Sequence, residues 1–277
     1  AGVIDAVDVL RDINLGKKID IGQRVAVIGG GNAAIDAVRT LNRLGREVHL
    51  LYRRTRNEMP AWSEEVDEAM AEGIDIQFLV APVRVIAEKG KVKQLECIRM
   101  ELGQTDKSGR ARPVPLKGSE FIMDIDTLVP AISQEPEIKW ITDGQDGFKL
   151  TKWNTIDVDV ETMFTGQEGI FAGGDVVLGP KTVTEAMSHG KIAAQMIDKY
   201  IKGEEIKRDY KVTQPAADVD VFEMTEEEVE NLRRYEMPML AISERAGNFN
   251  ETELGFSKIE AVCEAKHCLR CDKEEKE

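Results

Sequence analysis

The sequence lacks long apolar runs, a signal peptide and any excess of positive charge. No stretch approaches the roughly 20 apolar residues that a membrane-spanning helix needs. The first residues, AGVIDAVDVLRDI, have no basic flank and no long apolar segment, and the missing Met fits a processed or excised piece. The net charge of −14 disfavours nucleic acid and anionic membranes as partners. We therefore expect a cytoplasmic protein, or one that docks on a basic partner.

Hydrolase and protease motifs are also missing. The sequence has no G-x-S-x-G, no H-E-x-x-H and no pair of carboxylates placed for acid–base work. His49 falls in an expected strand and His189 inside an expected helix, where structural roles are favoured. No catalytic side chain is predicted.

Cysteine is scarce, and four residues are too few for a secreted disulfide scaffold of this length. Cys263, Cys268 and Cys271 crowd the C-terminal end as C-x4-C-x2-C. This spacing matches three ligands of a plant-type iron–sulfur site, which needs a fourth cysteine from Cys97 or from another polypeptide. A zinc site completed by His267, or free thiols, are the alternatives.

A strand–helix–strand pattern occupies residues 24–52. Residues 24–29, RVAVIG, are nearly all apolar, as expected of a buried parallel strand. Apolar residues then recur at helical spacing from Asn32 to Gly45, and residues 47–52, EVHLLY, predict the next strand. This is one β-α-β unit.

The turn between the first strand and the helix carries Gly29, Gly31 and Ala34 in the order G-x-G-x-x-A. Gly29 allows a tight turn, Gly31 lets the backbone approach a diphosphate, and Ala34 keeps the helix close to the strand. The helix N-terminus adds N–H groups and a partial positive charge. The pattern predicts a dinucleotide site.

The end of the second strand indicates which dinucleotide binds. An acidic residue there would bond the ribose hydroxyls of NAD, but this chain has Arg53 and Arg54, with Arg56 close by. Guanidinium groups suit a 2′-phosphate, so NADP(H) is favoured. The alternative is that the arginines only solvate a loop, and Glu58 is near enough to pair with one of them.

The remaining segments continue the mixed α/β pattern. A helix is expected between Pro60 and Gly73, and a β-hairpin around Lys89–Gly90. Further β segments are expected at residues 74–80, 121–132 and 169–177, and further helices at residues 182–203 and 225–236. Gly174 and Asp175 end the last β segment just before the helix that begins near Thr182. An acidic side chain there can accept hydrogen bonds from sugar or ribityl hydroxyls, and the helix N-terminus can stabilise negative charge on a ring.

Five stretches occur in the order found in one family: VAVIGGGNAAIDAVRTLNRLG, VHLLYRRTRNEMPA, LVPAISQEPE, GIFAGGDVVLGPKTVTEAMSHGKIAA and EAKHCLRCD. They resemble the small, flavin-containing chain of NADPH-dependent glutamate synthase and its relatives in other multi-subunit redox complexes. The chain has no cysteine between residues 22 and 96, which argues against the thioredoxin reductases.

The resemblance implies an α/β fold in which a Rossmann-type NADP(H)-binding domain is inserted into an FAD-binding domain of the disulfide-oxidoreductase type. The implied parts are residues 1–21 as a crossing segment, 22–128 as the NADP(H) domain, 129–205 as the second half of the FAD domain, and 206–277 as an extension with the cysteine cluster. The family's upstream FAD turn and cysteine-rich runs are not in this sequence. We therefore expect a fragment, or a chain completed by another polypeptide, that holds NADP(H) better than FAD.

The resemblance also implies roles for single residues. Those implied at the pyrophosphate are Gly29, Gly31, Asn32, Ala33 and Ala34, and those at the 2′-phosphate are Arg53 and Arg54. Those implied at FAD are Gly174 and Asp175 near the ribityl–phosphate region and Thr182 and Val183 at the ring, with Ile132 and Ser133 between nicotinamide and flavin. The family more often has Gly at the position of Ser133.

The predicted function is hydride transfer between NADP(H) and FAD, with electrons leaving through iron–sulfur clusters, in an NADPH-dependent flavin oxidoreductase. The predicted partners are other subunits or the missing N-terminal half of a redox complex, including ferredoxin-like or cluster-bearing proteins. The alternatives are a docking subunit that keeps the nucleotide fold without catalysis and, less favoured, a self-contained NAD(P)H–disulfide reductase.

Overall fold

A computed structural model describes residues 1–105, 109–132, 134, 136–138, 147, 149–208, 224–227 and 234–267. The chain folds into two compact units, the first built from residues 1–132 and 221–277 and the second from residues 133–220. In the described part of the chain, no helix is long and apolar enough to cross a membrane.

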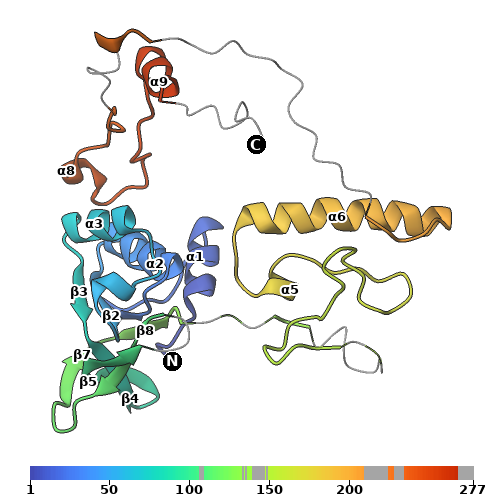
Figure 1. Ribbon diagram of the computed structural model, residues 1–277. Coiled ribbons are helices and arrows are strands. Elements are labelled where there is room, and N and C mark those ends of the chain that lie inside the picture. Colours follow the sequence, from blue (N-terminus) through green and yellow to red (C-terminus); the bar gives the residue numbers. More distant parts are fainter. Residues whose placement is uncertain are drawn as a thin grey trace. The chain divides into compact units, whose positions relative to one another are not determined.

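A four-stranded parallel sheet forms the centre of the first unit (Figure 1). Its strands, in order across the sheet, are β3 (Asp75–Phe78), β2 (Glu47–Tyr52), β1 (Arg24–Ile28) and β8 (Thr127–Pro130). Val25, Ala26 and Val27 of β1 have no exposed surface, because both faces of the sheet are covered. Burial on both faces explains why β1 reads as a continuous apolar run.

Three helices lie on one face of the sheet (Figure 1). They are α1 (Ala6–Asn14), α2 (Asn32–Arg43) and α3 (Ser63–Ala71), and a 3₁₀ turn, η1 (Arg56–Glu58), precedes α3. Val25, Val27 and Leu50 of the strands pack with Ile35 and Leu41 of α2 in one core cluster. Burying this cluster holds the glycine turn between β1 and α2 in place.

An antiparallel sheet covers the opposite face. Its strands are β4 (Val80–Glu88), β5 (Lys91–Thr105), β6 (Ala111–Pro115) and β7 (Phe121–Asp124), and β5 pairs with each of the other three. The alternate residues of the parallel strands, Ala26, Leu51 and Leu128, pack against Val80 and Leu95 in a second core cluster. The period-two alternation of side chains thus divides the core between helices and antiparallel strands.

The C-terminal part of the first unit is attached to α3 by charge. Its helices are α8 (Ile242–Arg245) and α9 (Lys258–Ala265). Arg245 is 4% exposed, and its guanidinium contacts the carboxylates of Glu68 and Glu72. Glu72 also contacts Arg39 and Arg43 of α2. Burial alone would raise the pKa of Glu72, but the hydrogen bonds and charges of Arg39 and Arg43 together hold it below its usual range.

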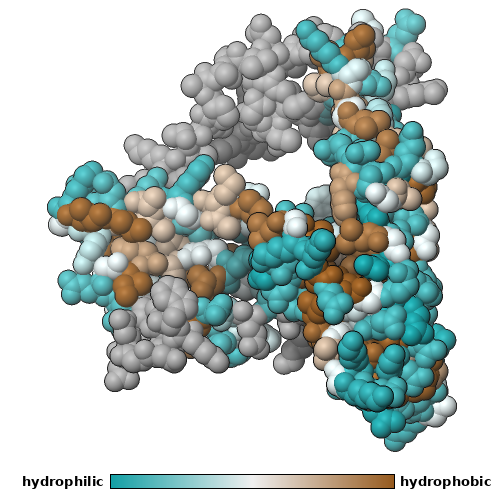
Figure 2. All heavy atoms as spheres, turned by 180° about the vertical axis from the view of Figure 1, so that it is seen from behind, coloured by the Kyte–Doolittle hydropathy of each residue, from teal (hydrophilic) through white to brown (hydrophobic). Residues whose placement is uncertain are grey.

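The second unit is organised around one long helix, and the helices in its described residues are α5 (Asp175–Leu178) and α6 (Val183–Lys202). Thr182 caps α6 through a capping box with Glu185, and Gly203 ends it in a left-handed conformation. The buried core of this unit is small and contains Met163, Ile192 and Met196. α6 leaves Val183, Met187 and Ile201 exposed, and such apolar patches interrupt the hydrophilic surface in Figure 2.

Most of the elements expected from the sequence are present, with one correction. The strand expected at residues 169–177 is wrong: Phe171 forms only an isolated bridge with Phe164, and residues 175–178 form α5. Gly174, with a φ of 73°, ends the extended conformation before Asp175, and the residues before it find only one bridging partner in the described part of the chain. The middle of the helix expected at residues 225–236, residues 228–233, lies outside the described residues.

Candidate functional site

The turn between β1 and α2 depends on glycine at its first position. Gly29 has a φ of 154°, and a Cβ placed on it would lie 2.4 Å from the carbonyl oxygen of Ala131. The same Cβ would lie 3.0 Å from the methyl group of Ala34, which is fully buried. Gly29 and Ala34 therefore let α2 start directly against the strands β1 and β8.

Gly31 lies in a different environment. It is the N-cap of α2 and has an extended backbone, with φ −94° and ψ 174°. A Cβ on Gly31 would meet nothing within 4 Å, so this glycine borders open space. Asn32 and Ala33 follow it in the exposed first turn of α2, where backbone N–H groups have no acceptor within a helix. The side-chain oxygen of Asn32 accepts a hydrogen bond from the Trp62 backbone at 3.0 Å, which ties this turn to the start of α3.

A cavity of about 620 Å³ opens beside the glycine turn. The described residues that line it are Ile28, Gly29, Gly30, Gly31, Leu51, Tyr52, Arg53, Arg54, Pro60, Val80, Ala81, Pro82, Arg110, Ala131 and Ile132. Three are arginines and none is acidic. This cavity brings together the glycine turn, the two arginines after β2 and Ile132, as the sequence predicted for separate reasons.

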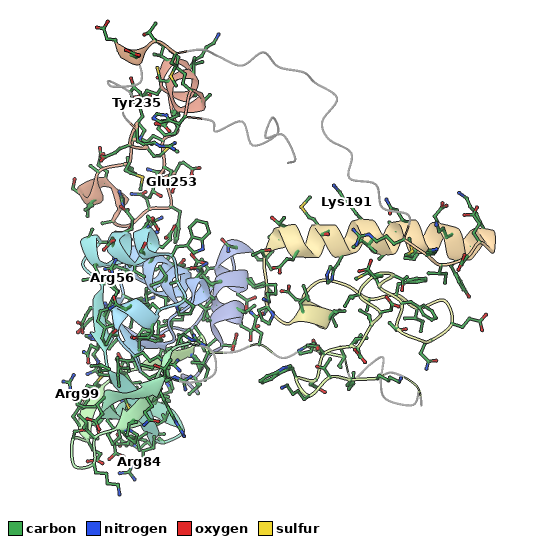
Figure 3. All side chains as sticks on the ribbon, viewed as in Figure 1. Arg56, Arg84, Arg99, Lys191, Tyr235 and Glu253 are labelled. Atoms are coloured by element: carbon green, nitrogen blue, oxygen red, sulfur yellow. The ribbon has the colours of Figure 1, made fainter. Side chains whose placement is uncertain are left out.

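The two predicted arginines, Arg53 and Arg54, and the nearby Arg56 differ in their surroundings. Arg53 is exposed, whereas Arg54 is 6% exposed and its Nε donates to the carbonyl oxygen of Ala111 at 2.8 Å. Arg56, labelled in Figure 3, does not line the cavity. It pairs with Asp67 of α3 at 2.6 Å. Arg53 and Arg54 therefore line this cavity, as Arg110 does, whereas Arg56 does not.

Glu58, the acidic residue near these arginines, caps η1. Its Oε2 accepts hydrogen bonds from the backbone and hydroxyl of Thr55, at 3.1 Å and 2.5 Å. Its carbonyl oxygen accepts a hydrogen bond from Tyr52 at 2.6 Å. The ring of Tyr52 fills the space beside Gly30, where a Cβ would lie 2.3 Å from a ring carbon. Tyr52 was not among the predicted site residues, although its place just before Arg53 is a usable signal.

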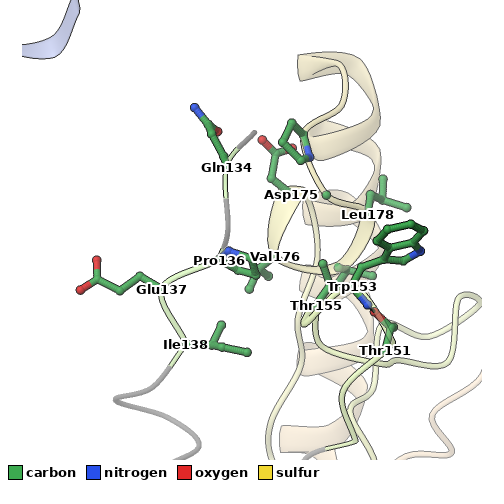
Figure 4. A pocket seen from close by; sticks show the side chains of 13 residues that line it. Gln134, Pro136, Glu137, Ile138, Thr151, Trp153, Thr155, Asp175, Val176 and Leu178 are labelled. Atoms are coloured by element: carbon green, nitrogen blue, oxygen red, sulfur yellow. Dashed lines mark hydrogen bonds between the residues drawn. The ribbon is translucent and has the colours of Figure 1, made fainter. Parts of the chain in front are cut away.

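The second predicted half-site lies in the second unit. Gly174 is buried, and its N–H donates to Nδ1 of His189 at 3.1 Å, which gives that histidine a structural role. Asp175 is exposed and lines a cavity of about 660 Å³ together with Trp153 and Leu178 (Figure 4). The structure thus places Asp175 at a cavity. Among the described residues that line this cavity there is no cation, and the other charged side chain is the carboxylate of Glu137.

Thr182 and Val183 lie at the start of α6, and both are exposed. The N–H of Thr182 donates to the carboxylate of Glu185 at 3.1 Å. Together with the bond from the Thr182 hydroxyl, this contact holds the pKa of Glu185 below its usual range. A ligand at this helix end therefore meets Val183 and later N–H groups before that of Thr182.

The predicted metal ligands are only partly described. Cys263 is a half-buried free thiol in α9, and Cys268, Cys271 and the predicted contact residue Ser133 lie outside the described residues. Among the described residues there is no group of three side chains placed to hold a metal ion. Cys97 is fully buried in the core, and burial raises the pKa of its thiol to about 11, so it does not fit the role of a fourth ligand.

Comparison with known proteins gives a family and several relatives. The pattern of the pyridine nucleotide-disulphide oxidoreductases matches residues 1–190. The NADP(+)-dependent formate dehydrogenase subunit beta of Moorella thermoacetica is 41% identical, over 98% of this chain and 39% of that protein. The NADPH-Fe(3+) oxidoreductase subunit beta of Geobacter sulfurreducens is 38% identical, over 96% and 44%. The glutamate synthase [NADPH] small chain of Azospirillum brasilense is 37% identical, over 65% and 38%. The chain thus spans about two fifths of the length of these relatives.

Solved structures give the same fold at low sequence identity. The thioredoxin reductase of Lactococcus lactis is 22% identical with a TM-score of 0.55, over 73% of this chain and 58% of that one. FprA of Mycobacterium tuberculosis in complex with NADPH is 18% identical with a TM-score of 0.53, over 72% and 58%. These likenesses confirm the predicted Rossmann-type oxidoreductase fold.

Proposed function

The chain belongs to the pyridine nucleotide-disulphide oxidoreductase family, and on that basis we propose that it is the NADPH-handling part of a flavin and iron–sulfur oxidoreductase. The identity to glutamate synthase small chains confirms the predicted resemblance. Two of the relatives above are named as beta subunits, which supports a place for this chain in a multi-subunit redox complex.

The observation that carries the proposal is the cavity beside the glycine turn. Gly31 presents backbone without a Cβ, and the first turn of α2, with Asn32 and Ala33, offers N–H groups to a diphosphate. Arg53 and Arg54 line the same cavity. A guanidinium group binds a phosphate through paired, charge-assisted hydrogen bonds. Its hydrogen bond to an uncharged ribose hydroxyl is much weaker. The arrangement favours NADP(H) over NAD(H).

The FAD contacts are supported by placement. In the second unit, Asp175 offers a carboxylate that can accept hydrogen bonds from ribityl hydroxyls. The N-terminus of α6 at Val183 offers a partial positive charge for a flavin ring. We assign the backbone contact with the flavin ring to Val183 alone, because the N–H of Thr182 already donates to the carboxylate of Glu185. Ile132, which lines the nucleotide cavity, is also proposed to lie between the two rings, together with Ser133, which lies outside the described residues.

The bound cofactors supply the chemistry, NADPH a hydride from C4 and FAD an acceptor at N5. The residues of this chain bind and orient them, and neither a general acid nor a general base is required. The cysteine tail, Cys263, Cys268 and Cys271, is proposed to hold an iron–sulfur cluster completed by another polypeptide. Such a cluster would give electrons from a bound flavin a path toward other subunits.

Nucleotide titration of the full chain tests this proposal. We expect NADPH to bind at least about 10-fold more tightly than NADH. The double variant Arg53→Ala/Arg54→Ala should weaken NADPH binding by at least about 100-fold, since each guanidinium–phosphate contact contributes roughly 1.5–3 kcal/mol. NADH binding should change little. Arg56→Ala is the matched control, because Arg56 pairs with Asp67 outside the cavity lining.

Two results would contradict the proposal. Equal affinity for NADH and NADPH in the natural chain removes the 2′-phosphate argument. Recovery of partner proteins by a chain that binds neither nucleotide favours the docking subunit instead.

A further inference from the structure

A two-stranded ribbon lies against Arg54, one of the arginines after β2. In this ribbon, here the β5–β6 ribbon, residues 100–105 of β5 pair with residues 111–115 of β6. The other half of β5 pairs with β4 and β7 instead. The ribbon is therefore the extension of a strand whose remainder is anchored in the antiparallel sheet.

The ribbon holds Arg54 in place. The carbonyl oxygen of Ala111, the first residue of β6, accepts the Nε hydrogen of Arg54 at 2.8 Å. The backbone of Arg54 is fixed as well, because its carbonyl oxygen accepts from Leu79 at 3.1 Å. A guanidinium is planar, so a bond at Nε sets the direction in which its other N–H groups point. The side chain is nearly fully buried, so little freedom is lost when it meets a ligand.

The ribbon also brings a third cation to the cavity. Arg110, next to Ala111, is exposed and lines the same cavity as Arg53 and Arg54. None of the described residues that line this cavity carries a negative charge. Arg110 is 56 positions from Arg54 in the sequence, and only the pairing of β5 with β6 brings the two segments to one site.

We propose that the β5–β6 ribbon is the second wall of the adenosine 2′-phosphate site, with Arg110 contacting the phosphate and the Ala111 carbonyl positioning Arg54. This inference rests on the proposed function, because it assigns a further specificity residue to the same site. The ligand recognised is a phosphate monoester on the ribose of an adenine dinucleotide. A guanidinium that stacks on the adenine ring instead would serve NADH and NADPH alike, so the two nucleotides separate the two roles.

The test compares three single variants of the full chain. Arg110→Ala should weaken NADPH binding about 10-fold or more, since one hydrogen-bonded charge contact contributes roughly 1.5–3 kcal/mol. NADH binding should stay within about twofold. Arg110→Lys should recover part of the loss, because an ammonium keeps the charge but not the paired hydrogen bonds. Arg112→Ala is the control, since Arg112 is also exposed, lies two residues along the ribbon, and does not line the cavity.

The outcomes separate this inference from the proposed function. If Arg110→Ala binds NADPH with the same affinity as Arg112→Ala, the inference is overturned. The proposed function still holds in that case if Arg53→Ala/Arg54→Ala loses NADPH affinity. If Arg110→Ala weakens NADH and NADPH equally, Arg110 does not read the 2′-phosphate, which also overturns it. If the natural chain does not prefer NADPH, the proposed function fails first. Thermal unfolding of each variant shows that folding is intact, as expected for an exposed side chain.

Discussion

Two glycines that lie two positions apart in the same turn, Gly29 and Gly31, should respond to alanine in different ways. At Gly29 a methyl group would meet the Ala131 carbonyl oxygen at 2.4 Å, on a backbone with φ of 154°. At Gly31 it would meet nothing within 4 Å, on an ordinary extended backbone. Gly29→Ala therefore disturbs folding, whereas Gly31→Ala disturbs only what enters the cavity.

The magnitudes follow from these environments. A non-glycine residue in such a strained conformation costs about 1–3 kcal/mol, and the contact with a backbone oxygen adds to it. In a unit of this size, each kcal/mol lowers Tm by roughly 2–4 °C. Gly31→Ala has two opposing effects on stability. Alanine is a poorer N-cap than glycine, which destabilises the fold, but it lowers the entropy of the unfolded chain, which stabilises the fold, and each effect is about 1 kcal/mol or less. The new methyl group would separate a diphosphate from the N–H groups of α2, and losing two such bonds weakens NADPH binding about 100-fold or more.

Calorimetric titration with NADPH and thermal unfolding without nucleotide measure both effects. We expect Gly31→Ala to melt within about 3 °C of the natural chain and to bind NADPH poorly. Gly29→Ala should melt at least about 5 °C lower. Natural NADPH affinity in a folded Gly31→Ala chain would refute the reasoning, because no ligand would then approach the α2 N-terminus over this residue.

Two further predictions concern stability. Arg245→Ala should speed chymotrypsin cleavage within residues 234–267, because Glu68 and Glu72 lose their ion pairs to the C-terminal segment. The control variant Arg234→Ala removes only the pair of Arg234 with Glu264 and should leave the cleavage rate unchanged. Asp126 should stabilise the fold above pH 4 and cease to do so as the pH falls through about 2, because hydrogen bonds from Arg24 lower its pKa from 3.8 to about 2. Asp126→Asn should flatten the dependence of the urea midpoint on pH in that range.

The elements of the first unit could be predicted from the sequence because each carries a strong local signal. The apolar run of β1 and the sequence EVHLLY of β2 fix a parallel sheet, and Lys89–Gly90 marks the β4–β5 turn with two positive φ values. In the second unit the signal misled at residues 169–177. An apolar stretch there predicts a strand, but a strand needs a neighbour, and the described residues offer Phe171 only one bridging partner.

The site was predictable where it is local and not where it is assembled from distant segments. Gly29, Gly31, Arg53 and Arg54 lie in one β-α-β unit, so spacing alone brings them together. Arg110 reaches the cavity only through the register of β5 with β6, in which Thr105 pairs with Ala111 after a bulge. Single-sequence reasoning has no access to that register, because a slip of two residues leaves the period-two pattern of side chains unchanged.

An acidic chain can still bind a dinucleotide with several negative charges, because the charges that matter are the near ones. The net charge of −14 is spread over the molecule, and at about 0.1 M salt exposed charges farther than roughly 10 Å are largely screened. Within the cavity the balance is reversed, with three arginines and no acid among the described lining residues. The acids adjacent in sequence are also occupied: Glu58 accepts from Thr55, and Asp67 pairs with Arg56. Thr55 and Arg56, in the loop between β2 and α3, thus engage the carboxylates of Glu58 and Asp67, and we expect this to favour a 2′-phosphate in the proposed NADP(H) site.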